Sequence, residues 1–293
     1  MLHPGKMGAA LAMSVEGDVL WASAGRSRET AGRAMEAGIA DVGSQEALMA
    51  VVDVLVSVCP PAVALEVARQ VDDLGFDGLF VDVNAVSPAT ARHMDHLFTR
   101  FVDGGVVGPP PTSTRPRSTL ATRPDTPRTQ AGNHSRTRLY LSGEEADTVA
   151  SLFTGSSVEC RVIGSEAGRA SALKMAYAAW TKGTSALLLS VAALATSEEV
   201  IEELLSEWDL SIPELRERLE RVSMMIGDKA WRFVGEMEEI AQTYGDSGLP
   251  EEFHLAAAEI YSHLAHLKDQ PPGRLPGEVS EILLGRAPDQ SAT

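Results

Sequence analysis

Lys174 is the residue in this sequence best suited to acid–base chemistry. It lies in the stretch Gly164–Leu189, GSEAGRASALKMAYAAWTKGTSALLL, and the chain has only five lysines against twenty arginines. A lysine sheltered from water has a lowered pKa, so it can exchange a proton near neutral pH. The alternative is a lysine at a helix edge whose ammonium group reaches the solvent.

A glycine-containing turn at the start of the chain has the features of a phosphate-binding turn. Residues 2–13 read LHPGKMGAALAM, in which Pro4–Gly8 precedes an alanine-rich helical run. Such a turn lets the backbone approach a pyrophosphate and points helix N–H groups at it. We therefore expect Gly5, Lys6 and Met7 to bind a dinucleotide. The first glycine of the GxGxxG pattern falls at His3, and no strand precedes the turn, which predicts a truncated first strand or a misplaced translation start.

The next loop indicates which dinucleotide is bound. Asp18–Ser23 reads as a strand, and no acidic residue lies between Val19 and Arg28 to hold the ribose hydroxyls of NAD. Ser23, Arg26, Ser27 and Arg28 could instead bind the 2′-phosphate of NADP, with the Arg26 guanidinium as the main partner. The alternative is a solvated basic turn.

Strands and helices alternate through the amino-terminal half. Predicted strands at 51–58, 79–83, 101–103, 137–142 and 158–163 and predicted helices at 63–74, 89–100 and 144–153 indicate a parallel, doubly wound sheet. Loops at the carboxyl ends of such strands face the ligand crevice, which adds Cys59, Pro60 and Asn84 to the predicted cofactor site. The glycines of 103–110 predict either a close approach to a ligand or a plain turn.

The rest of the chain is predicted to be helical after one insertion. Residues 112–136, rich in Thr, Pro and Arg, read as a disordered surface insertion rather than a phosphate-binding arm. From 166 on, only helices are predicted, at 167–195, 197–207, 213–224, 227–244 and 251–267. We therefore expect a nucleotide-binding domain at 1–165, an all-α substrate and dimerisation domain at 166–270, and a loose tail at 271–293.

Composition excludes several other classes of protein. The formal charge of −16 argues against a nucleic-acid binder. No apolar run is long enough for a membrane span, and no signal peptide is recognisable, so we expect a cytoplasmic protein. The two cysteines and two HxxH pairs lack the spacing of metal ligands, so no metal site is predicted.

The motifs HPGKMG, GRS, CPP, VDVNAVSP, VDGGVVG and GRASALK occur in an order that resembles the β-hydroxyacid dehydrogenases, which include 3-hydroxyisobutyrate and 6-phosphogluconate dehydrogenases and the imine reductases. The stretch 231–261 is similar to a poorly characterised bacterial branch with a distinctive helical carboxyl-terminal domain. The resemblance implies a Rossmann-like fold, a homodimer formed through that domain, and Lys174 as the catalytic lysine of the GxGxxxK motif.

The resemblance also implies a pocket of altered polarity. The family's substrate-binding asparagines correspond to Tyr177 and Ala178, and the serine of its substrate loop corresponds to Val107, whereas Gly108 is retained. The acid that 6-phosphogluconate dehydrogenase carries a turn later corresponds to Thr181. We therefore expect a less polar substrate site, with Tyr177, Gly108 and Asn84 as candidate contacts.

These observations predict an NADPH-preferring oxidoreductase that acts on a small hydroxy acid or a related carbonyl compound. In such enzymes, the lysine exchanges a proton with the substrate oxygen while a hydride moves to or from the nicotinamide. The alternatives are an imine-reductase-like enzyme that uses the same cofactor, and a non-catalytic or decayed NADP-binding protein.

Overall fold

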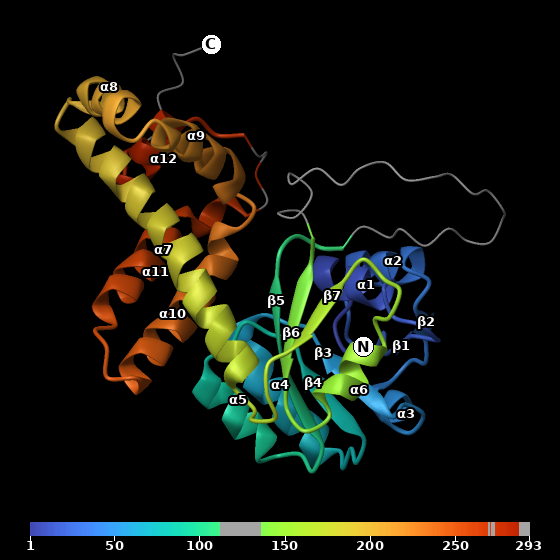
Figure 1. Ribbon diagram of the computed structural model, residues 1–293. Coiled ribbons are helices and arrows are strands. Elements are labelled where there is room, and N and C mark those ends of the chain that lie inside the picture. The colour runs from blue at the N-terminus through green and yellow to red at the C-terminus, as the bar shows by residue number, and fades with distance from the viewer. Residues whose placement is uncertain (112–135, 269, 271–272, 287–293) are drawn as a thin grey trace, which may run out of the picture. The chain divides into compact units, whose positions relative to one another are not determined.

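The computed structural model describes residues 1–111, 136–268, 270 and 273–286 (Figure 1). The chain divides into two compact units, Met1–Lys174 and Met175–Thr293. The predicted insertion lies, except for Arg136, outside the described residues. The division falls later than the expected boundary at 165, because the first residues of a long helix pack with the amino-terminal unit.

The amino-terminal unit is built on a sheet at the position that the sequence predicts. β3 (Val54–Ser57), β4 (Leu79–Asp82), β5 (Phe101–Val107), β6 (Arg138–Ser142) and β7 (Glu159–Val162) form a sheet in that order, and β1 (Leu20–Trp21) pairs with β2 (Ala40–Asp41). The pairs β1–β2, β3–β4, β4–β5 and β6–β7 are parallel. β6 runs antiparallel to β5, which corrects the prediction of a wholly parallel sheet. An antiparallel neighbour requires no crossover helix, and none lies between these strands among the described residues.

Helices cover both faces of the sheet and enclose two apolar cores. α1 (Lys6–Ala12), α2 (Arg28–Glu36) and α6 (Ala146–Ser151) contribute buried side chains to one core. α3 (Gln45–Met49), α4 (Pro61–Asp73) and α5 (Pro88–Asp95) contribute to the other. α5 ends before the predicted residue 100, so the segment that leads to β5 is not helical. Buried strands between two helical layers make this a doubly wound fold.

Met1 and Leu2 lie where a first strand would join the two groups of strands. The Leu2 N–H donates to the Val56 carbonyl oxygen in β3, and the Met1 amino group donates to the Leu20 carbonyl oxygen in β1. Met1 packs in one core and Leu2 in the other, which is the alternation of a strand. The described residues before α1 are assigned no strand, but these two residues occupy the place of one.

The second unit is all-helical, as predicted. It continues α7 (Arg169–Ser197) and contains α8 (Ile201–Ser211), α9 (Glu214–Ile226), α10 (Ala230–Asp246), α11 (Glu252–Leu264), the 3₁₀ turn η2 (Ala265–Leu267) and α12 (Pro276–Leu283). α12 lies in the segment predicted to be a loose tail. It forms because Pro276 begins the helix and Val279 is buried against neighbouring helices.

α7 is long and apolar enough to cross a membrane by length and composition. However, 50% of its most apolar window is buried inside the protein. Burial of half of this window against the protein's own chain is typical of a core helix.

Candidate active site

Gly105 allows α7 to pack directly on the backbone of β5. A Cβ atom at this position would lie 2.8 Å from the Ala170 carbonyl oxygen and 3.1 Å from the Lys174 Cβ. Any larger residue would therefore push the first turns of the helix away from the strand. Gly104 and Gly105 belong to a strand, so the prediction of a ligand-binding or plain turn is wrong for these two glycines.

The Lys174 side chain reaches back to the same strand. Its Nζ donates a hydrogen bond of 2.7 Å to the carbonyl oxygen of Val106, near the carboxyl end of β5. Burial of the ammonium group lowers the pKa of Lys174 from 10.5 to about 8. A partly sheltered amine with this pKa can both donate and accept a proton close to neutral pH.

The predicted phosphate-binding turn leads into α1. Gly5 is the N-cap residue, and within the described part of the chain no side chain caps this helix. Lys6 and Met7 form its first turn, so their backbone N–H groups have no partner within the helix. Such N–H groups suit an anion, which is the arrangement that the sequence predicts for Gly5, Lys6 and Met7.

Arg26 and His3 bring two unpartnered nitrogen atoms to the same region. Within the described residues, the Arg26 Nε and the His3 Nδ1 are buried without a hydrogen-bond partner. Burial, and to a smaller degree the nearby positive charges of Arg26 and the Met1 amino group, together lower the pKa of His3 to about 4. An anionic group beside Arg26 would pair with its guanidinium, so this residue fits a phosphate.

The loops after β3 and β4 are tied together through Asn84. Its Oδ1 accepts from the Cys59 N–H at 2.5 Å, and its Nδ2 donates to the Ser57 Oγ at 3.2 Å and to Asp82. Asn84 is 3% exposed, so its side chain holds the two loops. Burial, and to a smaller degree the charge of Asp82, raises the pKa of the Cys59 thiol to about 12, which makes this cysteine unreactive.

The other predicted site residues are distributed over several elements. The Ser23 N–H donates to Asp41, Ser27 caps α2, and Pro60 precedes α4. Gly108 has a φ of +113°, and a Cβ there would lie 2.6 Å from the Arg136 carbonyl oxygen. Tyr177 is 47% exposed and lies in the second unit, three positions after Lys174 on α7.

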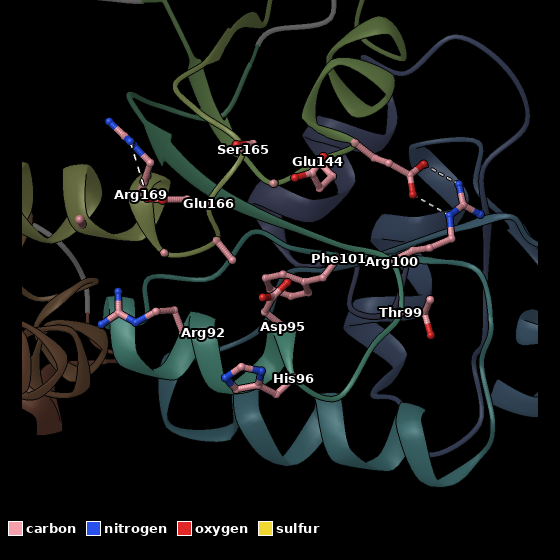
Figure 2. A pocket seen from close by; sticks show the side chains of 15 residues that line it. Arg92, Asp95, His96, Thr99, Arg100, Phe101, Glu144, Ser165, Glu166 and Arg169 are labelled. Carbon is pink, nitrogen blue, oxygen red and sulfur yellow. Dashed lines mark hydrogen bonds and ion pairs between the residues drawn. The ribbon is translucent and has the colours of Figure 1, made fainter.

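A cavity of about 550 Å³ lies at the opposite edge of the sheet (Figure 2). It is lined by the end of α5, by the start of β5 at Phe101 and by the segment that leads into α7. Arg100 and Glu145, which form an ion pair, are both among the lining residues. None of the residues predicted for the site lines this cavity, and its position at the amino ends of the parallel strands differs from that of ligands in doubly wound folds.

Sequence reasoning missed the side chains that hold the start of α7. The carboxylate of Asp103 accepts hydrogen bonds from Ser142 and Ser171, which lie 39 and 68 positions away in the chain. The available signal is a charged residue inside an apolar strand, because a buried carboxylate requires partners.

The carboxyl-terminal region of this chain and a part of its length match known sequences. Residues 195–264 match a family described as a domain of unknown function (DUF1932). An uncharacterised 28.5 kDa protein of Methanothermus fervidus is 29% identical over 185 residues, which are 62% of this chain and 63% of that protein. The match thus spans less than two thirds of that relative's length.

Two solved structures have the same fold over almost the whole chain. One is a conserved protein of unknown function described as similar to 3-hydroxyacid dehydrogenases, with 24% identity, a TM-score of 0.61 and coverage of 91% of this chain and 97% of the other. The second is Mycobacterium tuberculosis 3-hydroxyisobutyrate dehydrogenase with L-serine, with 16% identity, a TM-score of 0.61 and coverage of 97% of each chain. These structures confirm the predicted fold, which is Rossmann-like with a helical carboxyl-terminal domain.

Proposed function

We propose that this protein is an NADP(H)-dependent oxidoreductase that interconverts a small hydroxy acid, or a related alcohol, and its carbonyl compound. The observation that supports this most directly is the partly buried Lys174 amine at the carboxyl end of β5. In doubly wound folds, ligands bind at that edge of the sheet. The shared fold of a 3-hydroxyisobutyrate dehydrogenase supports the same class of reaction.

The nicotinamide would supply or accept the hydride at the substrate carbon. Lys174 would protonate the substrate oxygen during reduction and remove that proton during oxidation. With a pKa of about 8, the amine is mostly charged at neutral pH and is then a proton donor. Val106 fixes the position of the amine through its carbonyl oxygen.

Separate groups would hold the two phosphate regions of the cofactor. Gly5 and the first turn of α1 would bind the pyrophosphate through backbone N–H groups. Arg26 would bind the 2′-phosphate, a role supported by its buried, unpartnered Nε. The loops joined by Asn84 would line the nicotinamide side, and Gly108 and Tyr177 would contact the substrate.

A fluorescence titration with NADPH and NADH tests this function. We expect the wild-type protein to bind NADPH more tightly, and Arg26→Ala to weaken NADPH binding about 10- to 100-fold while NADH binding stays unchanged, because one charge-assisted phosphate contact is lost. Arg69→Ala, which changes an exposed arginine on α4 outside the predicted cofactor site, is the matched control. Failure of the wild-type protein to bind either nucleotide would refute the proposal.

Substrate screening would then start from L-serine and 3-hydroxyisobutyrate, with their carbonyl forms and simple imines alongside. Turnover of hydroxy acids that disappears in Lys174→Met, with NADPH binding intact, supports the assigned role. Full turnover in that variant would remove Lys174 from the mechanism. Reduction of imines alone would favour the imine-reductase-like alternative.

We also propose that the protein forms a homodimer through α7. Trp180, Leu187 and Leu194 are 70%, 47% and 62% exposed and recur every seven residues, which places them on one stripe of the helix. A repeated apolar stripe suits the same stripe on a second copy. We expect Leu187→Glu to be monomeric in sedimentation velocity, and Leu210→Glu, on α8 outside the stripe, to remain dimeric. A wild-type protein that sediments as a monomer would contradict this proposal.

A further inference from the structure

A buried polar row crosses four strands of the sheet. Ser57 in β3 pairs in register with Asp82 in β4, Asp82 with Asp103 in β5, and Asp103 with Ser142 in β6. All four side chains are completely buried. Polar groups at such positions are unfavourable unless every one is hydrogen-bonded, so each member of the row requires hydrogen-bond partners.

The Asp103 end of the row holds the start of α7. The Asp103 Oδ2 accepts from the backbone N–H groups of Gly168 at 3.0 Å and Ser171 at 2.9 Å, and its Oδ1 accepts from the Ser171 Oγ at 2.6 Å. Ser142 donates to Asp103 and accepts from the Ala170 N–H at 3.0 Å. Three of the N–H groups at this helix end are thereby satisfied by two side chains of the sheet.

The same strand receives the Lys174 amine one turn further along the helix. Asp103 and Val106 lie three positions apart on β5, and Ser171 and Lys174 lie three positions apart on α7. The strand therefore contacts the helix at its first turn, at Gly105 and at the Lys174 Nζ. A displacement of the first turn would move the amine away from the Val106 carbonyl oxygen.

We propose that Asp103 is a positioning residue for Lys174: by binding the first turn of α7 it sets where the amine lies against the end of β5. This inference rests on the proposed function, because it assigns a purpose to the position of the proton-exchanging lysine. Asp103 does not touch the substrate in this proposal, and it acts only through the helix.

Competitive labelling of lysines with trace acetic anhydride, read by peptide mass spectrometry over a range of pH, tests the proposal without substrate or cofactor. The five lysines lie far enough apart to be followed separately, and the exposed Lys6 and Lys268 serve as internal references. In the wild-type protein we expect the labelling midpoint of Lys174 near its pKa of about 8.

Asp103→Asn should raise the Lys174 midpoint by about one pH unit, because a displaced amine regains contact with water. The direction is informative. Loss of a negative charge alone would lower the pKa of a lysine, so only displacement raises it. Ser142→Ala changes no charge and should raise the midpoint as well. If Asp103→Asn does not fold, Ser171→Ala, which removes only the hydroxyl contact, takes its place.

Ser57→Ala is the matched control, since it removes an equally buried serine hydroxyl at the other end of the row, which bonds to Asn84 and not to α7. We expect it to lower the melting temperature and leave the Lys174 midpoint unchanged. An unchanged or lowered midpoint in folded Asp103→Asn and Ser142→Ala would overturn the proposal. Failure of the proposed function is seen separately, as absent nucleotide binding by the wild-type protein.

Discussion

Replacement of Lys174 by methionine should stabilise the protein at neutral pH and destabilise it at alkaline pH. Methionine has a similar length and no charge, so it removes the unfavourable burial of the ammonium group. The difference between 10.5 and about 8, multiplied by about 1.4 kcal/mol for each pKa unit, comes to about 3 kcal/mol. Partial exposure of the side chain reduces this to about 2 kcal/mol. The lost hydrogen bond to Val106 subtracts about 1 kcal/mol.

The pH dependence follows from the direction of the pKa change. Because the folded pKa lies below the unfolded value, the unfolded wild-type chain binds more protons between pH 8 and 10.5. The stability of the wild-type protein therefore rises through this window relative to Lys174→Met. The variant should be more stable by about 1 kcal/mol at neutral pH, and less stable by about the same amount above the window.

Urea denaturation of both proteins at a series of pH values, followed by circular dichroism, measures this difference. Lys6→Met, which replaces an exposed lysine, is measured alongside as the control. A Lys174→Met variant that is less stable by the same amount at every pH would refute the reasoning, because the ammonium group would then carry no burial penalty.

Two further predictions concern the proposed chemistry and the packing of α7 on β5. The kcat/KM for alcohol oxidation should rise as pH increases through about 8, and that for carbonyl reduction should fall over the same range, as Lys174 loses its proton; a profile that is flat there would exclude this lysine as the titrating group. Gly105→Ala should lower the free energy of unfolding by about 1–3 kcal/mol through overpacking against Ala170. Gly32→Ala in α2, where a Cβ has open space, should be neutral or stabilising, and equal losses in the two variants would contradict the close packing at Gly105.

The fold could be predicted because its strands are apolar runs between amphipathic helices. The segment 79–83, for example, is buried throughout β4 and was predicted within one residue. The antiparallel β6 could not be predicted in the same way, since its alternating pattern is compatible with either direction. α12 was missed because a proline- and glycine-rich segment predicts a loop until packing buries Val279.

The helix and the helix start that carry the candidate site could be predicted because their signal is local, whereas the long-range contacts that hold them could not. Lys174 and the turn at Gly5 lie in short stretches whose spacing indicates a helix and its start. Asp103 forms its contacts with residues far along the chain, which no short pattern reveals. The glycines beside it were assigned to a turn because glycine weakens strands, whereas here the missing Cβ atom admits a helix.

The boundary between the two units follows from the contacts between the start of α7 and β5. Lys174 is the last residue of the amino-terminal unit, although its helix continues for several turns into the second unit. The contacts of α7 with Asp103, Gly105 and Val106 explain why, since each joins the helix to β5 before the helix leaves the unit. An amine fixed in this way keeps its position relative to β5. In the function proposed above, the unfavourable burial of Lys174 is the energetic consequence of placing an ionisable group where it can exchange a proton.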